Sequence, residues 1–133
     1  MEYVKYTFIA LIGWGFWAIG SKMMTRYFNT SSTSFWISIS GIIFLSIYLI
    51  FRRDLMVSKQ ILYAVPVGIV SMIAILGFYK ALKIGPASVV VPLTNMYVIF
   101  PVLYGFVFLK ETISTTRVLG IIFAVLATIF LSL

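Results

Sequence analysis

The chain has 133 residues, of which 62% are hydrophobic and only 10% are charged. A soluble domain is typically about 25% charged, so this composition excludes a water-covered globular protein. The same apolar excess excludes a disordered chain. An integral membrane protein is the class that remains, in agreement with a mean hydropathy of +1.14.

The charge is strongly basic, with ten Lys and Arg residues against three Asp and Glu residues and a formal net charge of +7. Basic residues that flank membrane spans and face anionic headgroups explain this excess better than nucleic-acid binding does. The chain has no Cys and no His, which excludes disulfides, thiolate chemistry, haem ligation and ordinary zinc sites. Glu2, Asp54 and Glu111 are its only carboxylates, so we expect no enzyme, no metal and no cofactor.

Five apolar segments are long enough to cross a hydrocarbon core about 30 Å thick, which needs roughly 20 helical residues. Short connections separate them and hold most of the charge. The first segment lacks a small-residue cleavage site and is read as a retained span. The sequence therefore predicts an all-α, polytopic membrane protein with a single transmembrane domain over residues 1–133. The spans are expected at about residues 3–22, 33–51, 61–82, 87–109 and 116–133.

Five spans place the two termini on opposite sides of the membrane. The N-terminal side carries six of the flanking cations and the other side carries four. The six are Lys5, Arg52, Arg53, Lys59, Lys110 and Arg117, and the four are Lys22, Arg26, Lys80 and Lys83. The positive-inside rule predicts a cytoplasmic N-terminus in the cell membrane. The two sides differ by only two cations, so insertion in both orientations is also allowed.

The fourth span contains two prolines, Pro92 and Pro101, which cannot donate to the carbonyls of Ser88 and Tyr97. Asn95 lies between them on the helical face of Ser88 and Pro92. A kinked helix with free carbonyls and an amide suits a solute path and a gating bend. The alternative is a bend that only shapes packing, with Asn95 bonding a neighbouring helix.

The first span places Trp14, Trp17 and Ser21 on one face. Tryptophan usually anchors a helix at the membrane interface, but these two lie about half-way along the span. They are therefore candidates to line a cavity, with Ser21 as a hydrogen-bonding group. Lys22 ends the span, where it either snorkels to the interface or draws an anionic group towards a pore.

Three further residues are candidates for substrate binding: Trp36 and Ser38 in the second span, and Tyr79 near the end of the third. Serines in apolar helices also serve tight packing. Gly120, Ala124 and Thr128 follow a four-residue spacing in the fifth span, which predicts a helix-packing face. No carboxylate lies in the middle of a span, so a buried acid for proton-coupled export of organic cations is missing.

The stretch Phe78-Tyr79-Lys80-Ala81-Leu82-Lys83-Ile84-Gly85-Pro86-Ala87-Ser88, which continues to Pro92-Leu93, resembles the EamA-type repeat of the drug/metabolite transporter superfamily. The loop pair Lys110-Glu111, Gly120 in the last span and the opening Gly13-Trp14-Gly15-Phe16-Trp17 fit the same repeat. The resemblance covers essentially the whole chain. Small multidrug resistance proteins, a four-span relative, use an acid in their first span that this chain lacks.

The resemblance implies a solute carrier that works by alternating access. Most members of this family have two five-span repeats of opposite orientation, and this chain has one. We therefore expect a secondary transporter of small organic metabolites, an exporter or exchanger, that acts as a homodimer, antiparallel by preference, with the site between the copies. The alternative is a non-transporting membrane subunit that supports a partner through the small-residue face of the fifth span. The expected partners are the lipid bilayer and a small-molecule substrate, without nucleic acid.

Overall fold

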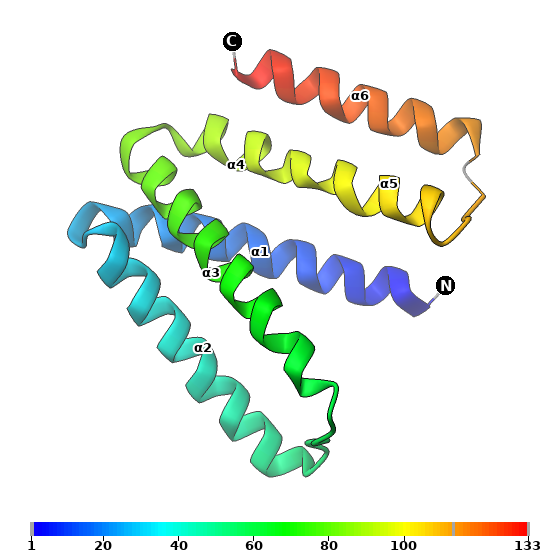
Figure 1. Ribbon diagram of the computed structural model, residues 1–133. Helices are drawn as coiled ribbons and strands as arrows, with labels where there is room; N and C mark the ends of the chain where they lie inside the picture. Colours follow the sequence, from blue (N-terminus) through cyan, green and yellow to red (C-terminus); the bar gives the residue numbers. More distant parts are fainter. Residues whose placement is uncertain (1, 113, 133) are drawn as a thin grey trace. The chain divides into compact units, whose positions relative to one another are not determined.

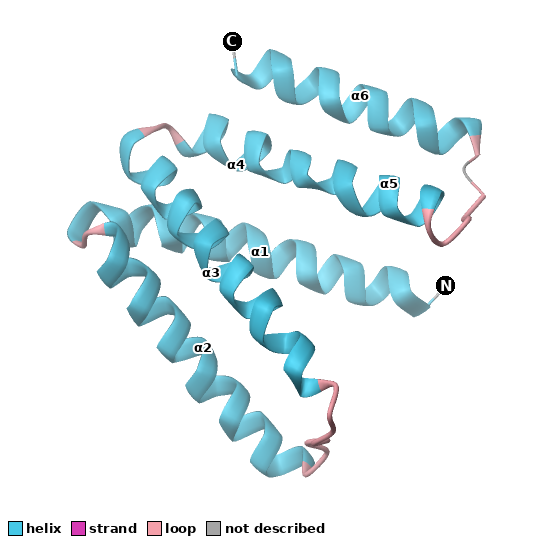
Figure 2. Ribbon diagram, in the orientation of Figure 1, coloured by secondary structure: helices cyan, strands magenta, loops and turns pink. Residues whose placement is uncertain are grey.

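The computed structural model describes residues 2–112 and 114–132, and in this part of the chain all regular structure is helical (Figure 2). The elements in chain order are α1 (Glu2–Tyr27), α2 (Thr30–Arg52), α3 (Ile61–Ile84), α4 (Ala87–Asn95), the 3-10 turn η1 (Met96–Val98), α5 (Ile99–Val107) and α6 (Thr115–Ser132). The prediction of an all-helical, five-span repeat is confirmed, with α4, η1 and α5 together forming the fourth span.

Four of the described helical segments have the length that a bilayer requires, and α6 has a shorter apolar part. α1, α2, α3 and the segment Ala87–Val107 are each long and apolar enough to cross a membrane. α6 has 18 residues, which at 1.5 Å per residue gives about 27 Å, close to the thickness of the hydrocarbon core. Its apolar part, Val118–Leu131, carries no charge.

The ends of α2 show how local sequence fixes the helix boundaries. Before its first residue, Asn29 has extended backbone and its Oδ1 accepts from the Ser32 N–H at 2.8 Å, which satisfies a backbone donor that the first turn leaves free. After its last residue, Arg53 adopts a left-handed conformation with φ 53°. The Arg53 N–H donates to the Leu49 carbonyl at 2.8 Å, and the chain then leaves the helix axis.

The chain divides into two compact units, residues 1–84 and 85–133. In the first unit, α3 packs against both α1 and α2, and α1 also contacts α2. Figure 1 shows that the end of α1, the start of α2 and the end of α3 converge, whereas the other ends spread apart. Every residue from 61 to 74 of α3 is exposed, so the packing of this unit is concentrated at one end.

In the second unit, α6 lies alongside the broken fourth span and packs against α4 (Figure 1). The break at η1 directly precedes α5, in which Pro101 is the third residue. Pro101 has no N–H for the Tyr97 carbonyl, and its ring crowds that carbonyl. The turn before it therefore tightens from α to 3-10 geometry. The expected irregularity of the fourth span is thus present at Pro101, whereas Pro92 lies within the regular helix α4.

Candidate functional site

The first unit contains a small buried cluster in which polar residues outnumber apolar ones. We call it the three-helix junction, and it consists of Ser21 and Thr25 of α1, Thr33 and Ser34 of α2, and Tyr79 and Leu82 of α3. Ser21, Thr33, Tyr79 and Leu82 are at most 1% exposed. All six lie at the converging helix ends, so this is where the unit is closed.

An aromatic contact borders the junction. The Trp17 ring of α1 stacks on Phe78 of α3, with ring centroids 5.2 Å apart and planes 11° apart. Trp17 also lies 5.9 Å from the Tyr79 ring. Since Trp17 is one helical turn before Ser21, the stack continues the α1–α3 contact beyond the buried hydroxyl. Trp17 keeps 37% of its surface exposed, so it forms the edge of the junction.

Two lysines tie the converging ends together. The Lys22 ammonium group donates to the Leu82 carbonyl near the end of α3. The Lys83 ammonium group donates to the Phe28 carbonyl, in the turn between α1 and α2, at 3.3 Å. Both carbonyls lie at or just beyond a helix end, where a cation is favoured by the helix dipole. Lys22 therefore stabilises the closed end of this unit.

Two hydroxyls of the junction are enclosed without a hydrogen bond, because Thr33 Oγ1 and Ser34 Oγ have no partner among the described residues. The Ser21 side chain instead interacts with the Tyr79 hydroxyl, and Thr25 Oγ1 donates to the Lys22 carbonyl at 2.9 Å. Hydroxyls elsewhere in the described helices donate to a carbonyl of their own helix. Examples are Thr94 to Val90 at 2.7 Å and Thr7 to Tyr3 at 2.9 Å. A buried polar group without a partner costs about 1–3 kcal/mol, so the junction combines tight packing with an unmet demand for hydrogen bonds.

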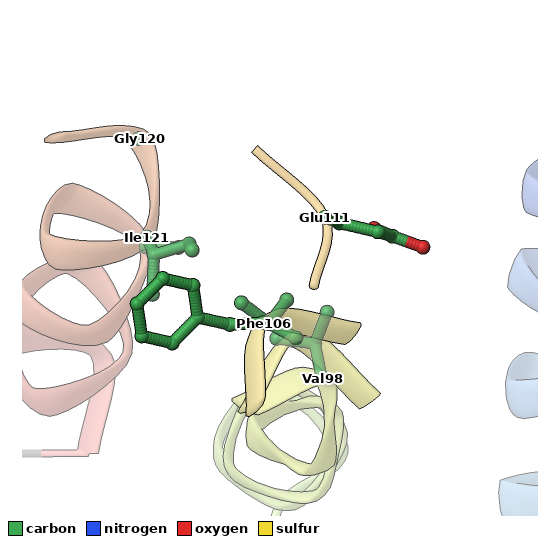
Figure 3. Close-up of a pocket in the computed structure, with 7 residues that line it drawn as sticks. Val98, Phe106, Glu111, Gly120 and Ile121 are labelled. Atoms are coloured by element: carbon green, nitrogen blue, oxygen red, sulfur yellow. The ribbon is translucent and has the colours of Figure 1, made fainter. Parts of the chain in front are cut away.

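The second unit carries a separate, shallow groove of about 390 Å³ between the fourth span and α6. Its lining is apolar except for Glu111, and the residues are Val98, Val102, Phe106, Glu111, Gly120, Ile121 and Ala124. In Figure 3 the Phe106 ring points towards Ile121, whereas the Glu111 side chain points away from both. The groove therefore offers an apolar wall with one carboxylate at its rim.

Glu111 is held by the end of α5. Lys110 adopts a left-handed conformation with φ 52°, which turns the chain back so that the Glu111 N–H donates to the Gly105 carbonyl at 3.0 Å. The carboxylate then covers Gly105, and a Cβ at that position would lie 3.1 Å from Glu111 Oε2. A larger residue at position 105 would therefore require the Glu111 carboxylate to move by a few tenths of an ångström.

The comparisons with known proteins agree with this architecture. The model of the EamA-like transporter family matches residues 2–133. The chain belongs to the EamA-like transporter family. An uncharacterized protein of Methanocaldococcus jannaschii is 32% identical over 99 residues, which cover 73% of this chain and 72% of the relative. No solved structure matches significantly.

Membership in this family fixes the class of the protein, because the family is one of membrane transporters. The chain is accordingly a multi-pass membrane protein, and its predicted assignment to the EamA-type repeat is confirmed. The matched stretch is a similar share of both chains, so the relative has nearly the same length, that of one five-span repeat.

The structure distributes the predicted binding residues between the two units of this family member. Ser21 and Tyr79 meet in the junction, with Trp17 and Lys22 at its border. Ser38 is half-buried one turn after Ser34. Trp14 and Trp36 are 64% and 52% exposed, and Asn95 is exposed at the end of α4. Their roles in binding stay predictions.

The predicted packing face of α6 is divided between two environments. Thr128 is 6% exposed and its hydroxyl donates to the Ala124 carbonyl at 2.9 Å. Gly120 and Ala124 instead line the groove, and a Cβ on Gly120 would meet nothing within 4 Å. The small residue at 120 thus leaves space open and does not admit a close neighbour within the described chain.

Sequence reasoning did not single out Thr25, Thr33, Ser34 or Leu82 as junction residues. A signal for two of them exists in the run Thr30-Ser31-Ser32-Thr33-Ser34, which places an unusual density of hydroxyls at the start of an apolar helix. Which of these hydroxyls become buried depends on where α3 ends, and that is a property of the tertiary structure.

Proposed function

We propose that the chain is one half of a secondary transporter for small organic metabolites, which works by alternating access as a dimer with the solute path between the two copies. Family membership over residues 2–133 is the observation that carries this proposal. Transporters of this architecture place the substrate between two pseudo-symmetric halves. One five-span repeat supplies one such half.

The surface around the break of the fourth span supports the same arrangement. Asn95 is exposed there, directly before η1, and Pro101 leaves the Tyr97 carbonyl without its helical donor. In lipid, an exposed amide and irregular backbone are both unfavourable, and they are tolerated where they meet protein or water. A second copy, or an aqueous path between two copies, would provide that environment.

The proposed substrate is a small anionic or zwitterionic metabolite such as an amino acid. The spans contain no central carboxylate that would attract an organic cation. Trp14, Trp17, Trp36 and Tyr79 would supply apolar walls. The groups Ser21, Ser38, Asn95 and Lys22 would supply hydrogen bonds and charge, while Pro92 and Pro101 would allow the fourth span to bend. We place the protein in the cell membrane with its N-terminus in the cytoplasm.

The odd number of spans provides a direct test of the dimer. Two copies joined by a short linker must insert with opposite orientation, because the first copy ends on the side opposite to its start. A fusion with one additional membrane span in the linker forces the parallel arrangement. In proteoliposomes supplied with amino acids, nucleosides and organic ions, we expect the short-linker fusion to transport and the other to be inactive.

Two other results would change the proposal. Transport only by the fusion with the additional span would establish a parallel dimer. No transport by either fusion, or by the single chain at any protein density, would favour a subunit that supports another protein. Full transport by single chains diluted to one per vesicle would overturn the dimer.

The role of Asn95 can be tested with its sequence neighbour as a control. Asn95→Ala should lower transport of the active fusion without reducing its insertion into the membrane. Thr94 is also exposed, but its hydroxyl already donates to the Val90 carbonyl at 2.7 Å. Thr94→Val should therefore transport normally. Equal activity of both variants would remove Asn95 from the solute path.

A further inference from the structure

The three-helix junction has the properties of an element with two states. Its hydroxyls at Thr33 and Ser34 are enclosed and lack partners among the described residues, and the enclosed Ser21 hydroxyl lies against the Tyr79 side chain. A helix always offers a serine or threonine the carbonyl four residues earlier, so such hydroxyls are satisfied in a permanently closed helix bundle at little cost. Here the closed packing leaves those of Thr33 and Ser34 unsatisfied, and any arrangement that admits water would relieve that cost.

The contacts that hold the junction closed are few and can be exchanged for water. They comprise the packing of Tyr79 and Leu82, the Trp17–Phe78 stack, and the donations from Lys22 to the Leu82 carbonyl and from Lys83 to the Phe28 carbonyl. Ammonium groups and helix-end carbonyls near the membrane surface can also find partners in water when the junction opens. Opening therefore sacrifices packing but no irreplaceable hydrogen bond.

The position of the junction is that of a barrier at one face of the membrane. It joins the end of α1, the start of α2 and the end of α3, whereas α3 is exposed from residue 61 to 74 and α1 from 11 to 17. In the closed state these three helices seal against one another only near this face. A solute that moves along these helices would therefore pass the junction either when it enters the path or when it leaves it.

We infer that the three-helix junction is a gate of the carrier, and that Ser21, Thr33 and Ser34 line its opening with hydroxyls that hydrogen-bond water and the polar groups of the passing solute. This inference rests on the proposed transport function and assigns to it a specific closing element. Thr33 and Ser34 thereby gain a role in the solute path that neither the sequence pattern nor the family match assigns to them.

The chain contains no cysteine, so single cysteines can be introduced without removing others. A cysteine thiolate attacks reagents of the maleimide type, and the thiolate forms in water and not in a dry protein interior or lipid. Ser21→Cys, Thr33→Cys and Ser34→Cys report on the junction. Ser58→Cys, in the exposed loop between α2 and α3, gives the rate for full access.

The matched control is Thr128→Cys in α6. Thr128 is as buried as Ser34, at 6% and 7% exposure, but its hydroxyl donates to the Ala124 carbonyl. An open state populated at about 0.1–10% should make the junction cysteines react about 10- to 1,000-fold more slowly than Ser58→Cys, and Thr128→Cys should react more slowly still. The probe is a membrane-impermeant maleimide added to vesicles from either side.

If the junction is a gate, at least two junction cysteines should be labelled from the side on which Lys83 lies. Their labelling rates should exceed that of Thr128→Cys. Junction rates equal to the Thr128→Cys rate in a correctly inserted protein would overturn the gate. That result would leave the dimer untouched, because the fusion experiment reads transport without reference to the junction. Thr33→Val supplies a second measurement: it should slow transport while it stabilises the fold, whereas a purely structural hydroxyl would leave transport unchanged.

Discussion

In the first unit, the buried hydroxyls of Thr33 and Ser34 have no hydrogen-bond partner among the described residues, although buried Thr25 donates to the Lys22 carbonyl of its own helix. In the second unit, the buried hydroxyl of Thr128 donates to the Ala124 carbonyl. Both units are built from apolar helices, and both offer each hydroxyl a carbonyl on its own helix. The difference therefore arises from how the side chains are packed. A buried hydroxyl in a membrane helix therefore does not necessarily stabilise the fold through a hydrogen bond.

The backbone shows the opposite distribution. In the first unit, α3 runs as a regular helix although it contains Pro66. In the second unit the fourth span is interrupted by η1 directly before α5, which contains Pro101. The first unit thus has regular helices but, within the described chain, unpartnered buried hydroxyls, whereas the second unit has a break in the main chain of its fourth span. Four pairs of substitutions test this comparison, from the largest expected effect to the smallest.

The largest effect is expected for Leu82→Ala. Leu82 is 0% exposed in the junction, and Leu62 of the same helix is 72% exposed. Truncation of a fully buried leucine costs about 2–5 kcal/mol through lost contacts and a residual cavity, whereas Leu62→Ala should cost less than about 0.5 kcal/mol. The free energy of unfolding in detergent micelles measures both. Similar losses would show that the junction does not hold the first unit together.

The next pair separates the two lysines that tie the helix ends. Lys22→Met removes the donor to the Leu82 carbonyl beside the buried cluster, and a hydrogen bond from a charged group contributes about 1.5–3 kcal/mol. Lys83 is exposed and its contact with the Phe28 carbonyl is longer, at 3.3 Å. Lys83→Met should therefore cost less than about 1 kcal/mol. The free energy of unfolding in detergent micelles measures both variants. A larger loss of this free energy for Lys83→Met would contradict the stronger role given to Lys22.

The third pair tests the difference between the hydroxyls directly, because the expected changes have opposite signs. Thr33→Val removes an enclosed hydroxyl without a partner and should raise the free energy of unfolding by about 1 kcal/mol. Thr128→Val removes a hydroxyl that donates to the Ala124 carbonyl of its own helix. This variant should lower the free energy of unfolding by about 0.5–1.5 kcal/mol, the net contribution of a typical intramolecular hydrogen bond. Destabilisation by Thr33→Val would mean that its hydroxyl has a favourable interaction in the native protein.

The sequence is sufficient for the five spans because long apolar helices are dictated by segment length and by the absence of water as a backbone partner. It also predicts an irregular fourth span, but it cannot separate Pro92 from Pro101. Both remove a donor, and only the local geometry shows that the turn before Pro101 tightens. An in-span proline is thus a weaker predictor of a break than its chemistry suggests, as Pro66 also shows.

The candidate site was predictable only where residues share one helix. Trp17 and Ser21 follow each other by one turn, and they do lie at the same place in the structure. Their meeting with Thr33 and Ser34 depends on the packing of three helices, for which sequence spacing contains no signal. Glu111 illustrates the same limit: its contact with Gly105 arises from the left-handed conformation of Lys110.

The smallest effect concerns this contact in the second unit. Gly→Ala in a helix interior gains up to about 1 kcal/mol of helix propensity, and Gly120→Ala should show most of that gain because nothing lies within 4 Å of the added Cβ. Gly105→Ala places its Cβ 3.1 Å from Glu111 Oε2, so the carboxylate must move and the gain should shrink or vanish. A double-mutant cycle with Glu111→Ala measures the coupling, expected at about 0.5 kcal/mol or more for groups in contact. If Gly105→Ala and Gly120→Ala stabilise equally and the cycle shows no coupling, the carboxylate does not rest on α5, and the acidic rim of the groove loses its support.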